Sequence, residues 1–549
     1  MCNLVHTRLS SSPVYEAISY AWGDPSKPRQ VICDGRVISV TQSLYSALQH
    51  LRHPEKSRTL WADAICINQD MNAEKNHQVA LMSKIYSQAA KTTVWLGEVE
   101  DDLVRKAFNY LIRLDTYFKS CLTNYPPFEY TDFQLPRPMA IELDANWIPE
   151  LYTSLGPLFA CSWFERLWVL QEVVLSEVVE MAFSTRVLPF DTMVYPILMI
   201  SRNLTVNWED VNIPGDFKAN LVNLFEFGVI REAFRRALPK TLFLFFETFR
   251  RTSMLLATDP RDQLYGLLGL GCTPGLIADY TLSVNEVFRD FVIWCLKQPN
   301  GIDVLGLAGL SNRAVDWASW IPKPRTNRRE ILCLHSYYEA SGPLLNPSSS
   351  TSPEVWKVVG ENVLEVKGAF IDDTATITQG RLRSSLENSI PGLKEIVKVA
   401  GCGQSDLTGE RYRKLCQALT GVLVPNGDRA SPTQSGLAHR CFQIASKVPL
   451  AFDEIRSIEM DYDDIWAAHI NYLYDKRFCC TSQDRFAWVP KVSDVNDRIC
   501  IFQGGRVPFV VRPQEDGKYV LVGECYVQGM MTGEALSLPD FRWETISLI

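Results

Sequence analysis

The chain has 549 residues, of which 46% are hydrophobic and 21% charged, a composition typical of folded globular proteins. Its formal net charge of -8 is small for this length and comes without a run of Lys or Arg, so the sequence gives no electrostatic basis for binding nucleic acid. Because the 15 cysteines lack metal-ligand spacing and no apolar run reaches about 20 residues, we expect reduced thiols, no metal site and no membrane span.

The first 185 residues alternate strand-like and helix-like patterns, which predicts an α/β domain with a mainly parallel sheet. Strands are expected at 15–23, 58–67 and 92–97, with a hairpin at 30–40 that turns at Asp34-Gly35. Helices are expected at 41–51, 72–89 and 101–120, the second of them capped by Asn72, and again around 162–175. The stretch 121–147 holds four prolines and predicts an irregular excursion.

From residue 186 to about 300 the periodicity is chiefly helical, and Ser and Pro in 342–353 indicate a linker. Beyond it, strands are expected at 356–360 and 363–372, and a β-meander at 498–531 with a turn at Asp516-Gly517. We therefore predict an α/β domain at 1–185, a mainly helical region at 186–340 and a mixed α+β region at 354–549. The N-terminus lacks a secretory signal, which favours a cytoplasmic protein.

Polar and aromatic side chains cluster where two of the predicted strands end. They are Trp22, Gly23 and Asp24 after the first strand, and Asp63, Asn68 and Gln69 near the end of the strand at 58–67. In a doubly wound sheet, ligands bind in the crevice beyond the carboxyl ends of the strands, so these residues are candidates for a binding site. The alternative is that they satisfy backbone groups as turn and cap residues, and both interpretations can hold together.

Five blocks appear in order over residues 15–172: YEAISYAWGD, LWADAICINQD, KIYSQA, TTVWLGE and SWFERLWVLQE. Together they resemble the fungal heterokaryon incompatibility (HET) domain. Downstream, ATDPRDQLYGLLGL, ADYTLSV, WASWIP and GECYVQGMMTGEAL resemble segments found in many HET-domain proteins. The chain begins closer to the first block than is usual in the family, which leaves open whether a first segment is missing.

The resemblance implies a role in fungal non-self recognition and innate defence, in which contact between incompatible partners triggers programmed death of the fused cell. HET domains are also thought to be distant relatives of TIR domains, some of which cleave NAD. This implies a TIR-like, flavodoxin-like fold for the N-terminal domain. It also implies NAD as a substrate, with no separate cofactor required, and a protein partner or self-association.

TIR-type cleavage of NAD needs one carboxylate, which holds the ribose hydroxyls and offsets the developing oxocarbenium charge. By resemblance to the TIR WCxxE helix, Glu172 is the candidate catalytic carboxylate and Trp168 a wall of the pocket, with Val169 in place of the motif's Cys. Ser19 and Tyr20 match the end of a TIR first strand and are assigned to the same crevice. Trp and Glu four residues apart share one helix face.

Simpler interpretations stand beside this one. Glu172 can be an ordinary helix residue or a partner for Arg166, and Cys66 with His77 has no spacing that indicates a nucleophile and its base. The glycines at 266–271 lie in a helical apolar pattern and predict packing instead of a phosphate loop. Whether the chain is an enzyme therefore stays open, and the alternative is a signalling module that acts by oligomerisation or partner recruitment.

Overall fold

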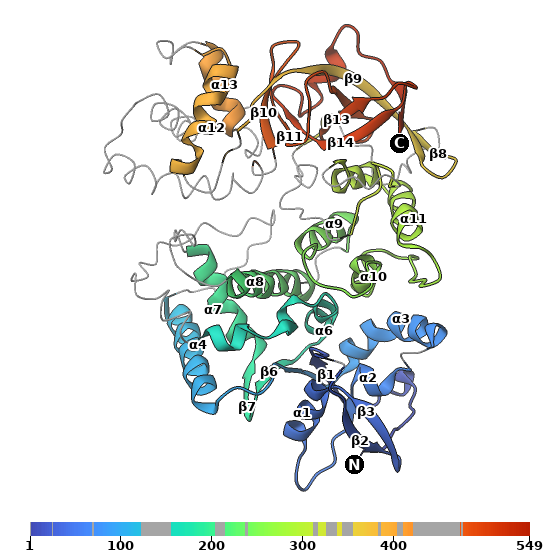
Figure 1. Ribbon diagram of the computed structural model, residues 1–549, viewed down its shortest axis with the longest axis vertical. Helices are drawn as coiled ribbons and strands as arrows, with labels where there is room; N and C mark the ends of the chain where they lie inside the picture. Colours follow the sequence, from blue (N-terminus) through green and yellow to red (C-terminus); the bar gives the residue numbers. More distant parts are fainter. Residues whose placement is uncertain are drawn as a thin grey trace. The chain divides into compact units, whose positions relative to one another are not determined.

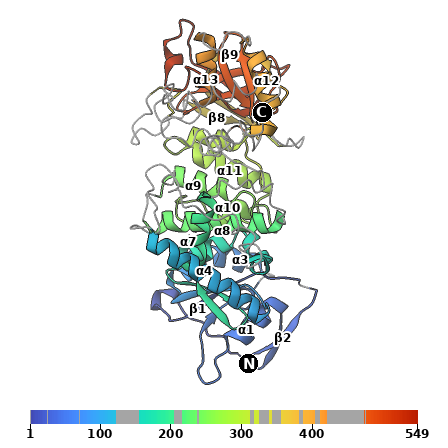
Figure 2. The same ribbon diagram turned by 90° about the vertical axis from the view of Figure 1, so that its left-hand side faces the viewer.

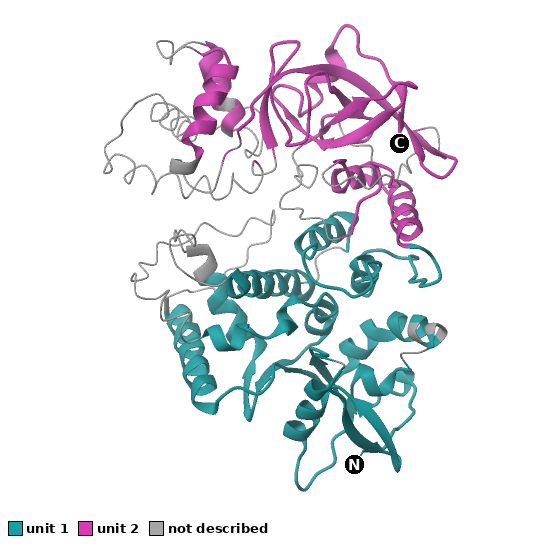
Figure 3. Cartoon of the chain, viewed as in Figure 1, with its two compact units in different colours: residues 1–283 teal, residues 284–549 magenta. Residues whose placement is uncertain are grey.

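The computed structural model describes residues 2–24, 26–68, 71–121, 155–203, 215–236, 240–310, 317–324, 338–342, 355–380, 382, 386–402, 410–420, 473 and 476–549. The chain forms two compact units, residues 1–283 and 284–549 (Figure 3). Nearly all of the predicted irregular excursion at 121–147 and of the predicted linker at 342–353 lies outside the described residues. The three-part division at 185 and 340 differs from these units and stays a prediction.

A five-stranded sheet forms the centre of the first unit (Figure 1). Its order is β4-β1-β5-β6-β7, in which β1 pairs in parallel with β4 and β5, β5 with β6, and β7 is antiparallel to β6. The strands are β1 (Glu16–Tyr20), β4 (Leu60–Trp61), β5 (Lys91–Trp95), β6 (Val179–Phe183) and β7 (Arg186–Pro189). The predicted mainly parallel sheet is confirmed, and its parallel strands, counted along the chain, have the order 2-1-3-4.

Helices cover both faces of this sheet. Ile18 and Tyr20 pack against α1, whereas Ala17 packs against α3, because successive side chains of a strand point to opposite faces. The helices are α1 (Gln42–Leu51), α2 (Asp63–Cys66), α3 (Asn72–Gln88), α4 (Asp101–Cys121), α6 (Val169–Leu175), α7 (Phe190–Asn203), α8 (Gly215–Arg235), α9 (Leu242–Arg251) and α10 (Asp262–Leu268). Within this unit α6 contacts both α3 and α8 (Figure 1), and α7 contacts both α4 and α8 (Figure 2).

The hairpin of β2 (Arg29–Cys33) and β3 (Arg36–Val40) is confirmed, with positive φ at Asp34 and Gly35 in the turn. Two other local predictions are wrong. The expected strand at 58–67 is only the short β4, because the chain turns into α2, where the amide of Ala64 donates to Oδ1 of Asp63 at 2.8 Å. Asn72 is the first residue of α3, and Met71 occupies the capping position without a side-chain hydrogen bond.

The second unit is rich in β-structure. Strands β12, β13, β14, β16 and β9 pair in that order, and β12 also pairs with β9, which closes the ring. The predicted meander is confirmed in β12–β14, with its turn at Asp516-Gly517. The strands are β8 (Trp356–Val359), β9 (Val363–Ile377), β10 (Lys476–Thr481), β11 (Phe486–Pro490), β12 (Arg498–Phe502), β13 (Pro508–Pro513), β14 (Tyr519–Glu524), β15 (Tyr526–Val527) and β16 (Glu544–Leu548), and the helices are α11 (Val284–Leu296), α12 (Leu386–Val399) and α13 (Glu410–Thr420).

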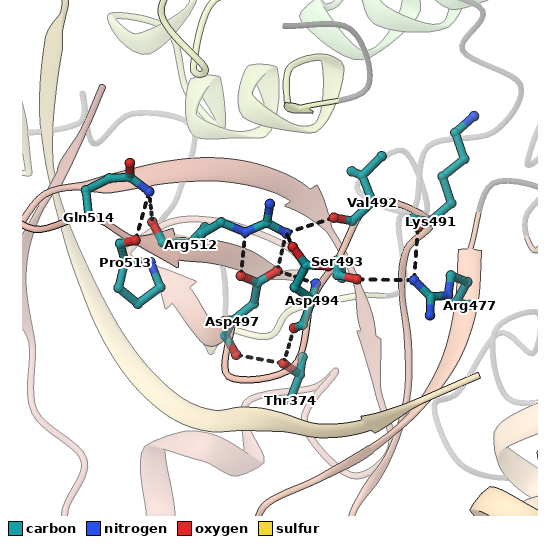
Figure 4. Close-up of polar contacts among 10 residues, drawn as sticks. All are labelled: Thr374, Arg477, Lys491, Val492, Ser493, Asp494, Asp497, Arg512, Pro513 and Gln514. Carbon is teal, nitrogen blue, oxygen red and sulfur yellow. Dashed lines mark hydrogen bonds and ion pairs between the residues drawn. The ribbon is translucent and has the colours of Figure 1, made fainter. Parts of the chain in front are cut away.

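An arginine and aspartate network fixes the loop between β11 and β12 of this unit (Figure 4). Arg512 donates to Oδ1 of Asp497 at 2.8 Å, forms an ion pair with Asp494 at 2.9 Å, and donates to the carbonyl of Val492 at 2.8 Å. The amide of Thr374 on β9 donates to the carbonyl of Asp497 at 2.9 Å. The loop is therefore held by the neighbouring strands β9 and β13.

Candidate functional site

Glu172 lies on the short helix α6, whose residues 169–174 are all buried. The helix begins directly after Trp168, which has helical backbone angles, so Trp168 and Glu172 keep the spacing of one helical turn. The 3-10 helix η2 (Ser162–Glu165) precedes it and buries Trp163 and Phe164. The buried side chains of η2 and α6 therefore fix the helix that carries Glu172, and with it the position of the carboxyl group.

The carboxyl group of Glu172 is enclosed, and the residue is only 5% exposed. Burial raises its pKa to about 7, because desolvation disfavours the charged form more than nearby Arg166 and the hydroxyls of Ser19 and Tyr86 favour it. Among the described residues, its Oε2 atom has no hydrogen-bond partner. An enclosed carboxyl group with a raised pKa and an open acceptor is a feature found at functional sites and also in structural cores.

Ser19 and Tyr20 at the end of β1 lie near Glu172. The Glu172 cluster is defined as Glu172, Ser19, Tyr20, Asp63, Tyr86 and Arg166. The Oγ atom of Ser19 accepts a hydrogen bond of 2.7 Å from Nε1 of Trp163, and the Ser19 hydroxyl also faces Glu172. The carbonyl of Tyr20 accepts a hydrogen bond from the guanidinium of Arg166. Arg166 thus connects the end of β1 to the segment before α6, and its charge opposes the rise in the pKa of Glu172.

Asp63 brings the carboxyl end of β4 into the same cluster. Its Oδ2 atom accepts a hydrogen bond of 2.8 Å from Nε1 of Trp22. Burial, followed by the charge of Asp63, raises the pKa of the Tyr20 hydroxyl. Asp63 also raises the pKa of Glu172 by charge repulsion, which places the two carboxyl groups within electrostatic reach of each other.

Three other predicted site residues, Gly23, Asp24 and Asn68, are exposed at turns. Asp24 is exposed and its Oδ1 accepts from the amide of Ser26 at 2.9 Å, and the hydrogen bonds from Ser26 lower the pKa of Asp24. Gly23 is exposed with φ of +73°, a backbone conformation that favours glycine. Asn68 is exposed and its amide donates to Glu74 at 3.0 Å, while Gln69 lies outside the described residues. Turn chemistry therefore accounts for Gly23 and Asp24.

Trp168 is half-buried and packs in a cluster with Tyr86, while its Nε1 atom donates to Oδ2 of Asp262 at 3.1 Å. No local sequence pattern shows that the hydroxyl of Tyr86 meets the carboxyl group of Glu172. The contact between Trp168 and Asp262 spans 94 positions and has no local signal.

The described residues also bear on a cysteine nucleophile, a metal site and a membrane span. Burial raises the pKa of Cys66, so its thiol is not an activated nucleophile, and His77 is exposed. No group of three or more His, Cys, Asp or Glu residues suited to a metal ion occurs within those residues. None of the helices described is both long enough and apolar enough to cross a bilayer.

The arrangement brings together two carboxyl groups, those of Glu172 and Asp63, with one cation and several hydroxyls near the carboxyl ends of β1 and β4. A carboxyl group with a pKa of about 7 exists in both protonation states near neutral pH, so it can accept a hydrogen bond from a sugar hydroxyl or stabilise a developing positive charge. Neighbouring Arg166 favours its ionised state.

Two family models match the chain. The family described as heterokaryon incompatibility protein (HET) matches residues 15–172, and the Het-6 beta-barrel domain matches residues 453–542. Among curated proteins, the chain is similar to heterokaryon incompatibility protein 6, OR allele, of Neurospora crassa. The identity is 25% over 638 aligned residues, which cover 97% of this chain and 91% of that protein. No solved structure matches the chain.

Proposed function

We propose that this chain, which carries a heterokaryon incompatibility (HET) domain at residues 15–172, acts in fungal heterokaryon incompatibility as an effector of programmed cell death. The similarity to the Neurospora crassa protein over nearly the whole of both chains supports this role. In the proposal the chain is a cytoplasmic protein that responds to an incompatible protein partner or to self-association.

We further propose that the effector step is cleavage of NAD at Glu172. The observation that carries this proposal is the buried Glu172 carboxyl group with its unpartnered Oε2 atom, beside Ser19 and Asp63 at the strand ends. The bond between ribose and nicotinamide breaks to release a neutral pyridine, so the leaving group needs no proton. The ionised carboxylate would hold the ribose hydroxyls and offset the oxocarbenium charge while water attacks.

The parallel sheet supports a TIR-like fold. Its parallel strands have the order 2-1-3-4, as in the first four strands of a flavodoxin-like sheet, and ligands of such sheets bind beyond the carboxyl ends of the strands. The antiparallel β7 departs from the all-parallel pattern. Ser19, Asp63 and Glu172 meet at the edge where this rule expects a ligand.

The enclosure of Glu172 favours a second candidate, a non-enzymatic signalling module. Glu172 is 5% exposed, so a substrate could not contact its carboxyl group without a movement of the surrounding residues. A carboxyl group buried in this way can also be part of the protein core, where it stays protonated and has no catalytic role. In that case death would follow from oligomerisation or recruitment of a partner, and NAD would not change.

The test is cellular NAD after induced expression of the wild type and of Glu172→Gln, with protein abundance matched and death scored in parallel. Asp303→Asn is the matched control, because Asp303 in the second unit is also buried and burial raises its pKa to about 7. Cleavage would be supported if cellular NAD falls before death in the wild type and in Asp303→Asn but does not fall in Glu172→Gln. Death in all three with steady NAD would overturn cleavage and favour the signalling module.

A further inference from the structure

Residues 255–282 lie beyond the segment matched by the HET model, yet they contact the start of α6 directly. The amide of Leu256 donates to the carbonyl of Glu165 at 2.5 Å, and the amide of Leu167 donates back to the carbonyl of Leu256 at 3.0 Å. One turn further along, Nε2 of Gln171 donates to the carbonyl of Gly266 at 2.8 Å. The segment thus holds both ends of the stretch 165–171.

Asp262 is the polar centre of this contact. It is 5% exposed, and its two carboxylate oxygens have different donors: Nε1 of Trp168 at 3.1 Å and the hydroxyl of Tyr280. Arg261 holds Tyr280 in turn, because its guanidinium donates to the carbonyls of Tyr280 at 2.8 Å and Leu282 at 2.6 Å. The orientation of the Asp262 carboxylate is therefore set by Trp168 on one oxygen and on the other by Tyr280, which Arg261 holds in place.

The indole of Trp168 lies next to the Glu172 cluster. Trp168 packs in the same apolar cluster as Tyr86, whose hydroxyl faces the carboxyl group of Glu172. Helical side chains lean toward the N-terminus of their helix, so Glu172 extends back over the turn that begins at Trp168. A displaced indole would open this side of the carboxyl group to water.

We propose that Asp262 is a positioning residue that holds the indole of Trp168 against the Glu172 cluster, so that residues 255–282 complete the candidate site. If Asp262 only stabilised the fold, it would make the same contacts, but its replacement would leave the exposure of the Glu172 carboxyl group to water unchanged. The consequence for catalysis rests on the function proposed above, whereas the effect on Glu172 itself does not.

Full-length variants test this connection. Asp262→Leu removes both hydrogen bonds, whereas Asp262→Asn keeps them, since its oxygen can accept from Trp168 and its amide can donate to the Tyr280 oxygen. Asn220→Leu is the control, because it removes a different buried hydrogen bond of 2.8 Å, to the carbonyl of Phe159. Trp168→Phe removes the indole donor alone and replaces Asp262→Leu if that variant does not fold.

The readout is the difference in thermal unfolding midpoint made by Glu172→Gln in each background, compared below pH 4.5 and above pH 7. The groups that face Glu172 from the surrounding elements are Arg166, Asp63, Tyr86 and the hydroxyl of Ser19, and all stay unchanged. We expect the pH-dependent part of this difference to persist in the wild type, in Asp262→Asn and in Asn220→Leu. In Asp262→Leu and Trp168→Phe it should fall by about half or more, because water then reaches the carboxyl group of Glu172. An undiminished difference in Asp262→Leu, or an equal loss in Asn220→Leu, would overturn the proposal.

Kinetics of NAD consumption by the same proteins separate this proposal from the proposed function. We expect kcat to fall about tenfold or more in Asp262→Leu, and to stay close to the wild type in Asp262→Asn. A wild type that consumes no NAD would remove the catalytic role of Glu172 and leave the titration to decide the positioning role. An active wild type whose kcat is unchanged in Asp262→Leu would contradict the positioning role alone.

Discussion

The indole nitrogen of Trp22 donates a hydrogen bond of 2.8 Å to Oδ2 of Asp63, and this contact joins the chain that leaves β1 to the chain that leaves β4. The other oxygen of Asp63 accepts from the amide of Ala64 at the start of α2. The same carboxylate therefore serves as a local turn group and as part of the charge environment of Glu172. Backbone chemistry, the first interpretation of this polar cluster, therefore applies to Asp63, and its role in a binding site stays a prediction.

Asp63→Asn should lower the pKa of Glu172, because it removes a negative charge that opposes ionisation of the buried carboxyl group. The side-chain oxygen of asparagine can still accept from Trp22, and although the bond from the amide of Ala64 is lost, the backbone hydrogen bonds of α2 remain, so the loop should stay folded. The pKa is measured as the midpoint of the pH-dependent stability difference between each protein and its Glu172→Gln counterpart. Asp24→Asn is the control, since Asp24 is exposed at its own turn. An unchanged midpoint in Asp63→Asn would show that the two carboxyl groups are not coupled.

Glu172 should make the first unit less stable as pH rises from about 4.5 to about 7. Its folded pKa is raised from 4.5 to about 7, so across this window the native state keeps a proton that the unfolded state has lost. The cost is absent below the window and complete above it, at about 3 kcal/mol. Glu172→Gln lacks this cost, and chemical unfolding of both proteins across the window measures it.

Asp303 has a similarly raised pKa, so the dependence of wild-type stability on pH contains the titration of Asp303 as well as that of Glu172. Only the difference between the wild type and Glu172→Gln isolates Glu172, because Asp303 contributes equally to both. A difference that stays constant with pH would mean that the folded Glu172 titrates as it does in the unfolded chain.

Arg231→Lys should weaken the end of α6. Arg231 on α8 is buried and donates to the carbonyls of Val173, Ser176 at 2.7 Å and Glu177 at 3.0 Å, which are acceptors at and beyond the last turn of α6. A lysine cannot reproduce this fork of donors, so we expect a loss of about 2–4 kcal/mol in the free energy of unfolding.

Urea unfolding of purified protein checks this value, and Arg235→Lys is the matched control from the same helix. Arg235 is exposed, pairs with Asp191 at 2.8 Å and makes one bond of 3.2 Å to the carbonyl of Glu177, so we expect its replacement to cost about 1 kcal/mol or less. Equal losses in the two variants would contradict the capping role of Arg231.

Arg512→Lys should loosen the loop at 491–497 while the strands around it stay paired. The guanidinium contacts Val492, Asp494 and Asp497 together, and a single ammonium group cannot hold all three (Figure 4). Hydrogen exchange should become faster at the amides of Asp494 and Asp497 and stay unchanged in β13. Arg498→Lys is the control, because Arg498 pairs with the half-exposed Asp373 outside this loop.

Local sequence patterns were enough for much of the fold. The turn at Asp34-Gly35 needs positive φ at two positions, which few residue pairs accept, so the hairpin could be predicted from the pair alone. The meander at β12–β14 followed in the same way from strand alternation and Asp516-Gly517. The five ordered blocks of residues 15–172 were enough to predict the resemblance to the HET domain, and the HET family model matches the same residues.

Tertiary structure decided what these patterns left open. Asp63 starts a helical turn instead of ending a long strand, since its carboxylate meets both Trp22 and the amide of Ala64. The pKa of Glu172 depends on burial by elements distant in sequence, and Asp262 reaches Trp168 across 94 positions. Residue type and local periodicity set which elements form, but electrostatics and burial at a site depend on which elements pack together, and a sequence window does not contain that information.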